Sequence, residues 1–329
     1  MATTTTTVPG ASPAAGSRSF LSKLRDGDEI ARVITLLFAA SVVLITLMLV
    51  LQLWHGSALA RHKFGFNFFR TSVWDPVNDE YGALPFIYGT VVTAIVGLAL
   101  AVPLGIGAAI FLAELAPQKV SDMLEFFIDL LAAVPSVIYG LLGVFIVIPL
   151  MRNYVQPGLK AAFGFLPLFQ GPAFGVGFLT AGVVLAIMVI PYIISVSREV
   201  LLSVPRDQRE AALALGSTRW ESTWKVVVPF ARTGIMGSIF LALARALGET
   251  MAVTMVIGNT PTISASLFSP GYSIAAVIAN EFSEATGDLY VQSLIELGLV
   301  LFLLTFILNG LARLLIVVTA QRGSGMGHV

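Results

Sequence analysis

The sequence predicts an all-α polytopic membrane protein with six transmembrane helices. Of its 329 residues, 57% are hydrophobic and only 12% are charged, which is about half the charged fraction of a soluble domain. The chain also contains six apolar stretches, each long enough to cross a hydrocarbon core of about 30 Å, which requires about 20 helical residues. Lipid is therefore the expected solvent around most of the chain.

The six predicted spans are distributed along almost the whole chain. Pro103, Pro135 and Pro191 lie inside or near the end of a span, where each removes a backbone donor and is expected to bend its helix. The softer segment Pro261–Asn280 is broken by Pro270, so we expect a short or re-entrant helix near the outer face rather than a seventh span. The spans are Ile30–Leu53, Pro85–Leu112, Phe126–Met151, Phe174–Val196, Gly234–Gly258 and Leu289–Val318.

The two ends of the chain are expected to be tails. Residues 1–29 are rich in Thr, Ala, Ser and Pro and contain no apolar block. Such a segment cannot bury enough surface to offset its ordering entropy, so we expect it to be disordered. Residues 321–329 are expected to form a second, shorter tail, which leaves residues 30–320 as one transmembrane domain.

The basic residues predict which side of the membrane each loop faces, because cytoplasmic loops carry an excess of Lys and Arg. With the N-terminus inside, thirteen basic residues fall in inner segments, five in outer loops and Arg245 within a span, which accounts for all 19. Both termini and the loop 197–233 are therefore expected to be cytoplasmic. The five outer residues are Arg61, Lys63, Arg70, Arg152 and Lys160.

Composition and motifs exclude several classes of function. The absence of cysteine rules out disulfides, thiolate metal sites and cysteine nucleophiles, and a net charge of zero indicates no nucleic-acid partner. No phosphate-binding loop of the G-x-x-x-x-G-K-[ST] type occurs, so a partner must bind any ATP. The histidines have no metal-ligand spacing, and no catalytic residue or cofactor is expected. Three acidic residues are interpreted as helix-end placements that favour the helix dipole: Asp122, Glu125 and Asp129.

The longest inner loop, residues 197–233, is also the most charged part of the chain. Pro205 and the charged residues after it predict the start of a helix. Gly216 predicts its end. A second short helix over Thr218–Val227 is expected to follow and to stop near Pro229. The loop is thus expected to form two short helices packed across each other.

The spacing of residues in this loop resembles the coupling motif of ABC importer permeases. That motif reads Glu-Ala-Ala, three residues, Gly, nine residues, an aliphatic residue, one residue, a second aliphatic residue and Pro. The family usually has Ile and Leu at the two aliphatic positions, whereas this chain has Val at both. In the family the loop docks into a groove on the ATPase subunit, so the resemblance implies that role here for Glu210, Ala211, Ala212, Gly216, Val226, Val228 and Pro229.

The fifth predicted span contains two charged residues, Arg245 and Glu249. Arg245 lies 11 residues into the span, or about 16 Å, and Glu249 is expected one turn later on the same face. Each charge at a helix centre costs about 2.5–3.5 kcal/mol, so we expect the pair to face a transport pathway. A guanidinium offers paired donors that match a tetrahedral oxyanion. The alternative is a structural ion pair that fixes packing between subunits.

The run from Arg245 to Asn259 resembles the C-type permease subunits of the phosphate-specific ABC transport system, whose membrane subunits carry Arg-Ala-Leu-Gly-Glu. The blocks Ala133–Ser136 and Val204–Gln208 are also similar, and the resemblance covers residues 30–320. It implies a type I ABC importer permease fold and a channel-forming subunit of an ATP-driven importer of inorganic phosphate. Such a subunit is not an enzyme and lies in the bacterial plasma (inner) membrane.

The resemblance also implies partners. These are a second, A-type permease subunit, an ABC ATPase dimer that binds the ATP, an extracytoplasmic phosphate-binding protein and membrane lipid. A permease for a related oxyanion, sulfate or molybdate, is the alternative function, because it would share the coupling loop. A secondary transporter would need no such loop, and an intramembrane enzyme would need a nucleophile–base or metal group that the spans do not show.

Overall fold

The computed structural model describes residues 28–324, and the side chains of residues 31–314. Across these residues the chain is helical apart from its connections and one short β-hairpin. Six helical segments are long and apolar enough to cross a membrane, which confirms the predicted fold class. They are Ala31–Gly56, Leu84–Leu115, Ser136–Phe163, Phe178–Leu202, Arg219–Leu247 and Asp288–Leu314.

The predicted tails fall largely outside the described residues. Helix α2 (Asp28–Gly56) already begins before the predicted boundary at residue 30, and helix α15 (Asp288–Ser324) runs past the predicted boundary at residue 320. Contacts divide the chain into one unit up to Gln52 and a second from Leu53 onward. Within the described residues the first unit is residues 28–52 of α2, and residues 31–49 are all exposed. A helix that is apolar on all sides suits a lipid or a partner helix as its surroundings.

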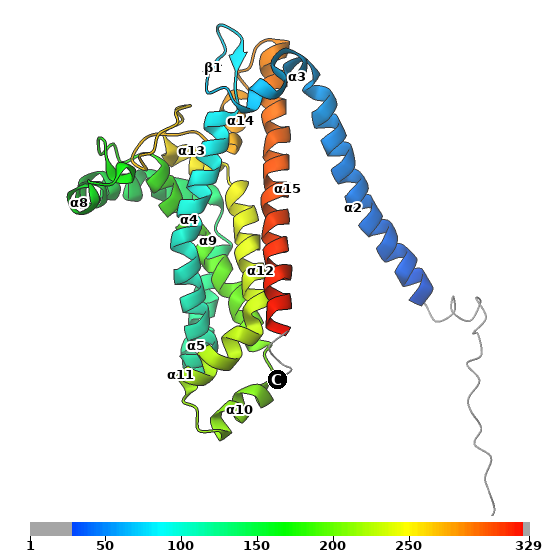
Figure 1. Cartoon of the computed structure of the whole chain (residues 1–329), viewed down its shortest axis with the longest axis vertical. Coiled ribbons are helices and arrows are strands. Elements are labelled where there is room, and N and C mark those ends of the chain that lie inside the picture. The colour runs from blue at the N-terminus through cyan, green and yellow to red at the C-terminus, as the bar shows by residue number, and fades with distance from the viewer. Residues whose placement is uncertain (1–27, 325–329) are drawn as a thin grey trace, which may run out of the picture. The chain divides into compact units, whose positions relative to one another are not determined.

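The second unit is a bundle centred on helix α9 (Phe178–Leu202), the most buried of the six candidate spans. Helices α4 (Leu84–Ile110), α12 (Val228–Leu247) and α15 run along the same general direction (Figure 1). Glycines bring α4 close to α9: a Cβ atom at Gly105 would lie 2.8 Å from the Ile193 side chain. Small residues serve this purpose at helix contacts in membranes.

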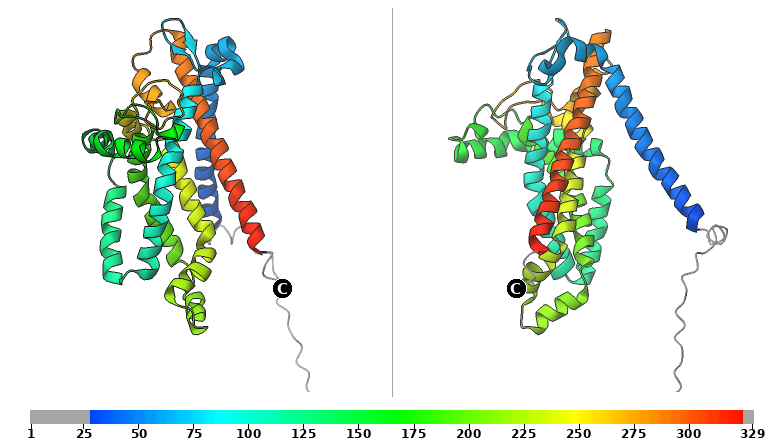
Figure 2. Two further views of the ribbon diagram at one scale, coloured as in Figure 1. Left: turned by 60° about the vertical axis from the view of Figure 1, so that its left-hand side comes forward. Right: turned by 45° about the vertical axis from the view of Figure 1, so that its right-hand side comes forward.

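The predicted third span is wrong, because helix α5 (Gln118–Ala132) and the helical run after it are separate. The sequence predicted a single helix over Phe126–Met151, but α5 ends before Pro135 and α6 (Ser136–Leu142) begins after it. Proline cannot donate the next helical hydrogen bond and disfavours a helical residue before it. Figure 2 shows α5 upright in the bundle and the following helical run lying crosswise to it. That run continues through η3 (Gly143–Val147), α7 (Ile148–Leu150), η4 (Met151–Val155) and α8 (Gln156–Phe163).

The end of the bundle opposite the 197–233 loop carries short elements (Figure 1). Trp74 donates to the Glu281 carboxylate at 2.8 Å and thereby fixes the hairpin to α14. The segment predicted as a short or re-entrant helix, residues 261–280, is an irregular loop followed by α14. The Phe178 and Leu179 backbone N–H groups donate to this loop, so it packs on the start of α9. The short elements are α3 (Ala58–Phe64), η1 (Gly65–Phe69), β1 (Trp74–Asp75), β2 (Glu80–Tyr81), η5 (Pro167–Phe169), α13 (Met251–Ile257) and α14 (Ile274–Glu281).

Candidate functional site

Helix α10 (Arg206–Ala214) lies in the 197–233 loop and is not continuous with the helices before and after it. It starts after Pro205 and ends before Gly216, as predicted. Gly216 has φ +87°, a left-handed conformation that suits glycine. Its N–H donates to the Leu213 carbonyl at 2.9 Å, and the Ser217 N–H donates to the Ala212 carbonyl at 3.2 Å. These two bonds form a Schellman end. A Cβ at residue 216 would meet no atom within 4 Å, so substitution strains the backbone without a clash.

The sequence predicted that the second helix of the loop would stop near Pro229, but the helix continues past this residue. Helix α11 (Arg219–Ser222) begins with a capping box, in which the Thr218 hydroxyl and the Glu221 carboxylate accept each other's backbone N–H. The π-helical turn η6 (Thr223–Val227) then leads directly into α12. Pro229 lies where the hydrogen-bond register changes between the two helix types, so its missing N–H is tolerated.

The motif residues of the loop lie on different faces. Ala212 is the buried residue of α10, whereas Glu210, Ala211 and Gly216 are exposed. Val226 and Val228 are half-buried, and Pro229 is exposed. Four large apolar side chains that the sequence motif did not single out are exposed on the same loop and are here called the loop apolar patch: Leu213, Leu215, Trp220 and Trp224.

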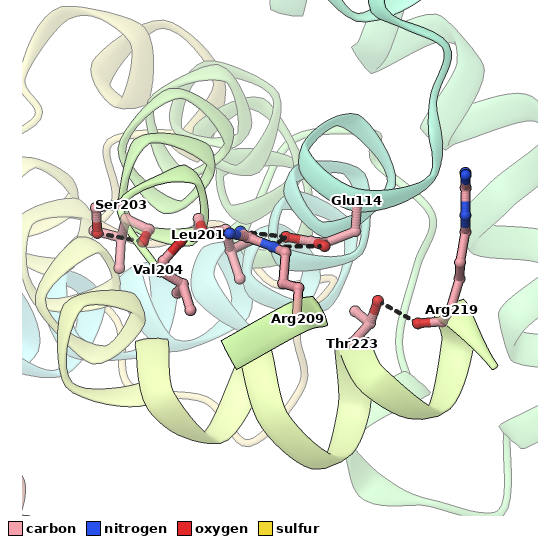
Figure 3. Close-up of polar contacts among 8 residues, drawn as sticks. Glu114, Leu201, Ser203, Val204, Arg209, Arg219 and Thr223 are labelled. Carbon is pink, nitrogen blue, oxygen red and sulfur yellow. Dashed lines mark hydrogen bonds and ion pairs between the residues drawn. The ribbon is translucent and has the colours of Figure 1, made fainter. Parts of the chain in front are cut away.

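Arg209 joins α10 to two other elements (Figure 3). Its Nη2 lies 2.8 Å from Glu114 Oε1, and its Nε donates to both Glu114 oxygens at 3.2 and 3.3 Å. Nη2 also donates to the Leu201 carbonyl at 2.7 Å, and Nη1 donates to the Val204 carbonyl. Glu114 belongs to the π turn η2 (Phe111–Leu115) that ends the α4 run. The sequence motif begins one residue later and gave no sign of these contacts.

Arg245 lies in the last turn of α12, and the predicted single span Gly234–Gly258 is wrong. Helix α12 ends at Leu247, and α13 begins at Met251 after a non-helical connection. Glu249 lies in that connection, so it does not follow Arg245 by one turn on a continuous helix. Its carboxylate accepts the Ala252 N–H at 3.2 Å, at the start of α13. Among the residues that the structure describes, no ion pair joins Arg245 to Glu249.

A tyrosine orients the Arg245 side chain. The guanidinium carbon lies 5.2 Å from the centroid of the Tyr192 ring on α9, within the range of a cation–π interaction. Arg245 is exposed on the surface of this chain, and Figure 1 shows α12 ending part-way along α15. Arg245 is therefore a charge within the depth of the bundle, held on one side by an aromatic face and open on the other.

A second polar group, between α5 and α9, is a packing contact. Glu125 pairs with Arg198 at 2.5 Å, and Asp129 accepts a hydrogen bond from Ser195 at 2.8 Å. The interpretation of these two acids as helix-end placements is therefore wrong, because both bond across to α9. They line a cavity of about 240 Å³. Glu199 lines the same cavity, and three carboxylates against one guanidinium would repel an anion, so this cavity does not suit an anionic substrate.

Comparison with known proteins gives consistent results. The family model described as "Binding-protein-dependent transport system inner membrane component" matches residues 101–316. A phosphate transport system permease protein PstC of Mesorhizobium japonicum is 46% identical over 293 residues, which cover 87% of this chain and 90% of that protein. The PstC of Xylella fastidiosa is 48% identical, covering 85% and 89%. The PstC of Pasteurella multocida is 49% identical, covering 86% and 89%.

Proposed function

We propose that Arg245 of this chain contacts the transported anion. The chain belongs to the family of binding-protein-dependent transport system inner membrane components. The chain is a multi-pass membrane protein and a permease subunit of an importer of inorganic phosphate. The names of its relatives favour phosphate over sulfate or molybdate. The chain itself is a translocation component, and ATP hydrolysis belongs to a separate subunit.

The environment of Arg245 is the observation that carries the proposal. A guanidinium stays charged in proteins, and a charged side chain that faces the hydrocarbon interior of a membrane is costly. Arg245 is exposed on this chain, and no carboxylate pairs with it within the described residues. Something other than lipid must therefore cover it. A water-filled pathway shared with a second, A-type permease subunit would leave the planar donor face free for phosphate.

Glu249 has a different part in the proposed pathway from the one that the sequence suggested. Its carboxylate is fixed by the Ala252 N–H, so it holds the connection between α12 and α13. The side chain is only half-buried, and a negative charge four residues from Arg245 would oppose an anion that dwells there. We expect Glu249 to weaken phosphate binding enough for release, without forming a resting ion pair.

The loop of α10 and α11 is the proposed docking surface for an ABC ATPase dimer that binds the ATP. Its loop apolar patch supports this role, because a large apolar group such as Leu215, with 89% of its surface exposed, suits burial against a partner. An extracytoplasmic phosphate-binding protein would dock at the opposite end. We propose further that the membrane is the bacterial plasma membrane and that both chain termini are cytoplasmic.

The orientation can be tested with single cysteines, because the chain contains none. Leu215 and Ala265 are both exposed and lie in the loops at opposite ends of the bundle. A membrane-impermeant thiol reagent added to intact cells is expected to label Ala265→Cys and to leave Leu215→Cys unlabelled until the cells are opened. Labelling of the residue 215 variant alone in intact cells would mean that the proposed orientation is inverted.

Tyr192 tests whether the position of Arg245 matters for uptake. Tyr192→Leu removes the aromatic face and is expected to lower phosphate uptake about two- to thirtyfold, because a cation–π contact contributes about 0.5–2 kcal/mol and about 1.4 kcal/mol corresponds to a tenfold change. Tyr192→Phe keeps the ring and is the matched control, so its uptake should stay close to that of the parent. Equal uptake by both variants would show that the Tyr192 ring does not position Arg245. Uptake of labelled phosphate per recovered complex is the measurement.

A further inference from the structure

We propose that Arg209 is a positioning residue, which fixes the coupling helix α10 to both α4 and α9 so that a movement of α10 moves the two membrane helices with it. The inference deepens the proposed function, since it rests on α10 being the helix that docks on the ATPase. It adds the residue through which that docking would reach the membrane helices.

Every nitrogen of the Arg209 guanidinium is engaged, and the acceptors come from two other elements. Nε and Nη2 bond the Glu114 carboxylate at the end of the α4 run. Nη2 and Nη1 bond the Leu201 and Val204 carbonyls at the end of α9 (Figure 3). The planar group offers donors in fixed directions, so one side chain holds three segments in one relative position.

The acceptors themselves favour a cation at this place. The last carbonyls of a helix have no partner within that helix and lie at the negative end of its dipole. Leu201 and Val204 lie at the end of α9 and just beyond it. The Glu114 side chain is only 10% exposed, and that of Arg209 is 21% exposed. Charged groups this far removed from water depend on each other, because removal of one leaves the other without compensation.

Little else attaches α10 to α4 and α9, because its other contacts are with α11 and η6 of the same loop. Ala212 is the one residue of α10 that is buried, so apolar packing beneath this helix is slight. Two surface hollows, of about 380 and 240 Å³, are each lined in part by Arg209 and Glu114, so neighbouring side chains do not pack around the pair on all sides. Apart from its two covalent ends, α10 is therefore held to α4 and α9 mainly through Arg209.

The test uses the complete importer, with this chain, its second permease subunit, the ATPase and the binding protein, in proteoliposomes. Phosphate imported per ATP hydrolysed is measured for Arg209→Gln, Arg209→Lys and Glu114→Gln. We expect Arg209→Gln to lower this ratio at least tenfold while ATP hydrolysis continues. Arg209→Lys and Glu114→Gln, which each keep part of the contact, are expected to lower it less.

Lys119→Gln is the matched control, because Lys119 is an exposed basic residue at the start of α5, outside the 197–233 loop. Surface substitutions of this kind usually have little effect, so the control should keep the parental ratio. Docking is followed separately, by cross-linking the ATPase to a cysteine at position 215. We expect this cross-link to persist in all three Arg209 and Glu114 variants.

A parental ratio in Arg209→Gln and Glu114→Gln would overturn the proposal. If Arg209→Gln fails to assemble, Arg209→Lys and Glu114→Gln decide in its place, and a parental ratio in both has the same meaning. A lost cross-link with a normal ratio in the remaining complexes would assign Arg209 to assembly alone. If Gly216→Leu uncouples the importer while the Arg209 variants do not, the docking role of the α10 loop is supported and only the positioning role of Arg209 is rejected.

Discussion

Arg245→Gln is expected to abolish phosphate uptake while leaving the importer assembled. Loss of one partner from a buried, charged hydrogen bond costs about 2–5 kcal/mol, which corresponds to a reduction of about 30-fold or more. Arg245→Lys keeps the charge but loses the planar donor pair, so it should retain a small fraction of uptake. The measurement is uptake of labelled phosphate, normalised to the amount of complex recovered from the membrane.

Glu249 separates this account from a purely structural role for the pair. If the two charges served only to fix packing, Arg245→Leu combined with Glu249→Leu should restore both assembly and uptake. We expect no such rescue, because the described structure contains no ion pair between them. Glu249→Gln alone should impair uptake only partly, since an amide oxygen can still accept the Ala252 N–H. A double variant with normal uptake would contradict the pathway assignment.

Gly216→Leu is expected to uncouple the importer, lowering phosphate uptake per ATP hydrolysed about tenfold. The residue has φ +87°, where a side chain costs about 1–2 kcal/mol, and 1.4 kcal/mol corresponds to a tenfold change in population. The strained loop would leave its Schellman end and present α10 to the ATPase in the wrong direction. Uptake and ATP hydrolysis are measured on the same purified complex in proteoliposomes.

Gly216→Asn is the matched control for this prediction. Asparagine tolerates the left-handed conformation better than other non-glycine residues do, and a Cβ at residue 216 meets no neighbouring atom. The Asn variant should therefore couple almost as well as the parent. Full uptake with substrate-stimulated hydrolysis in Gly216→Leu would remove the support for docking by this loop. An equal loss of coupling in both variants would show that the added side chain, and not the backbone conformation, causes the defect.

The sequence predicts most of the spans because each rests on a local signal. Apolar runs placed the ends of α2, α4, α9 and α15 within six residues of their observed positions, and Pro205 and Gly216 marked the two ends of α10. The same signal failed at Pro135 and at Gly248, where hydrophobic composition continues while the helix ends. Average hydropathy does not register a change in chain direction, so the crosswise run after α5 and the connection before α13 were both missed.

The candidate site, too, was predictable from the sequence only in part. The coupling motif and Arg245 were found from spacing and from a charge within an apolar run. Their partners were not, because these contacts join distant parts of the chain: Arg209 and Glu114 are 95 residues apart, and Tyr192 and Arg245 belong to different helices. Only the packing of α4, α9 and α12 brings such residues together, and one sequence carries no direct record of that packing.

The central claim is that a positive charge at position 245 contacts phosphate, and chemical rescue tests it most directly. Arg245→Cys in this cysteine-free chain, assembled with cysteine-free partner subunits, is expected to lose uptake. Treatment with a thiol reagent that attaches an ammonium group should restore part of it. Attachment of a neutral group of similar size, or of a sulfonate, should restore none. Normal uptake by the untreated Cys variant, or equal rescue by all three groups, would contradict the claim.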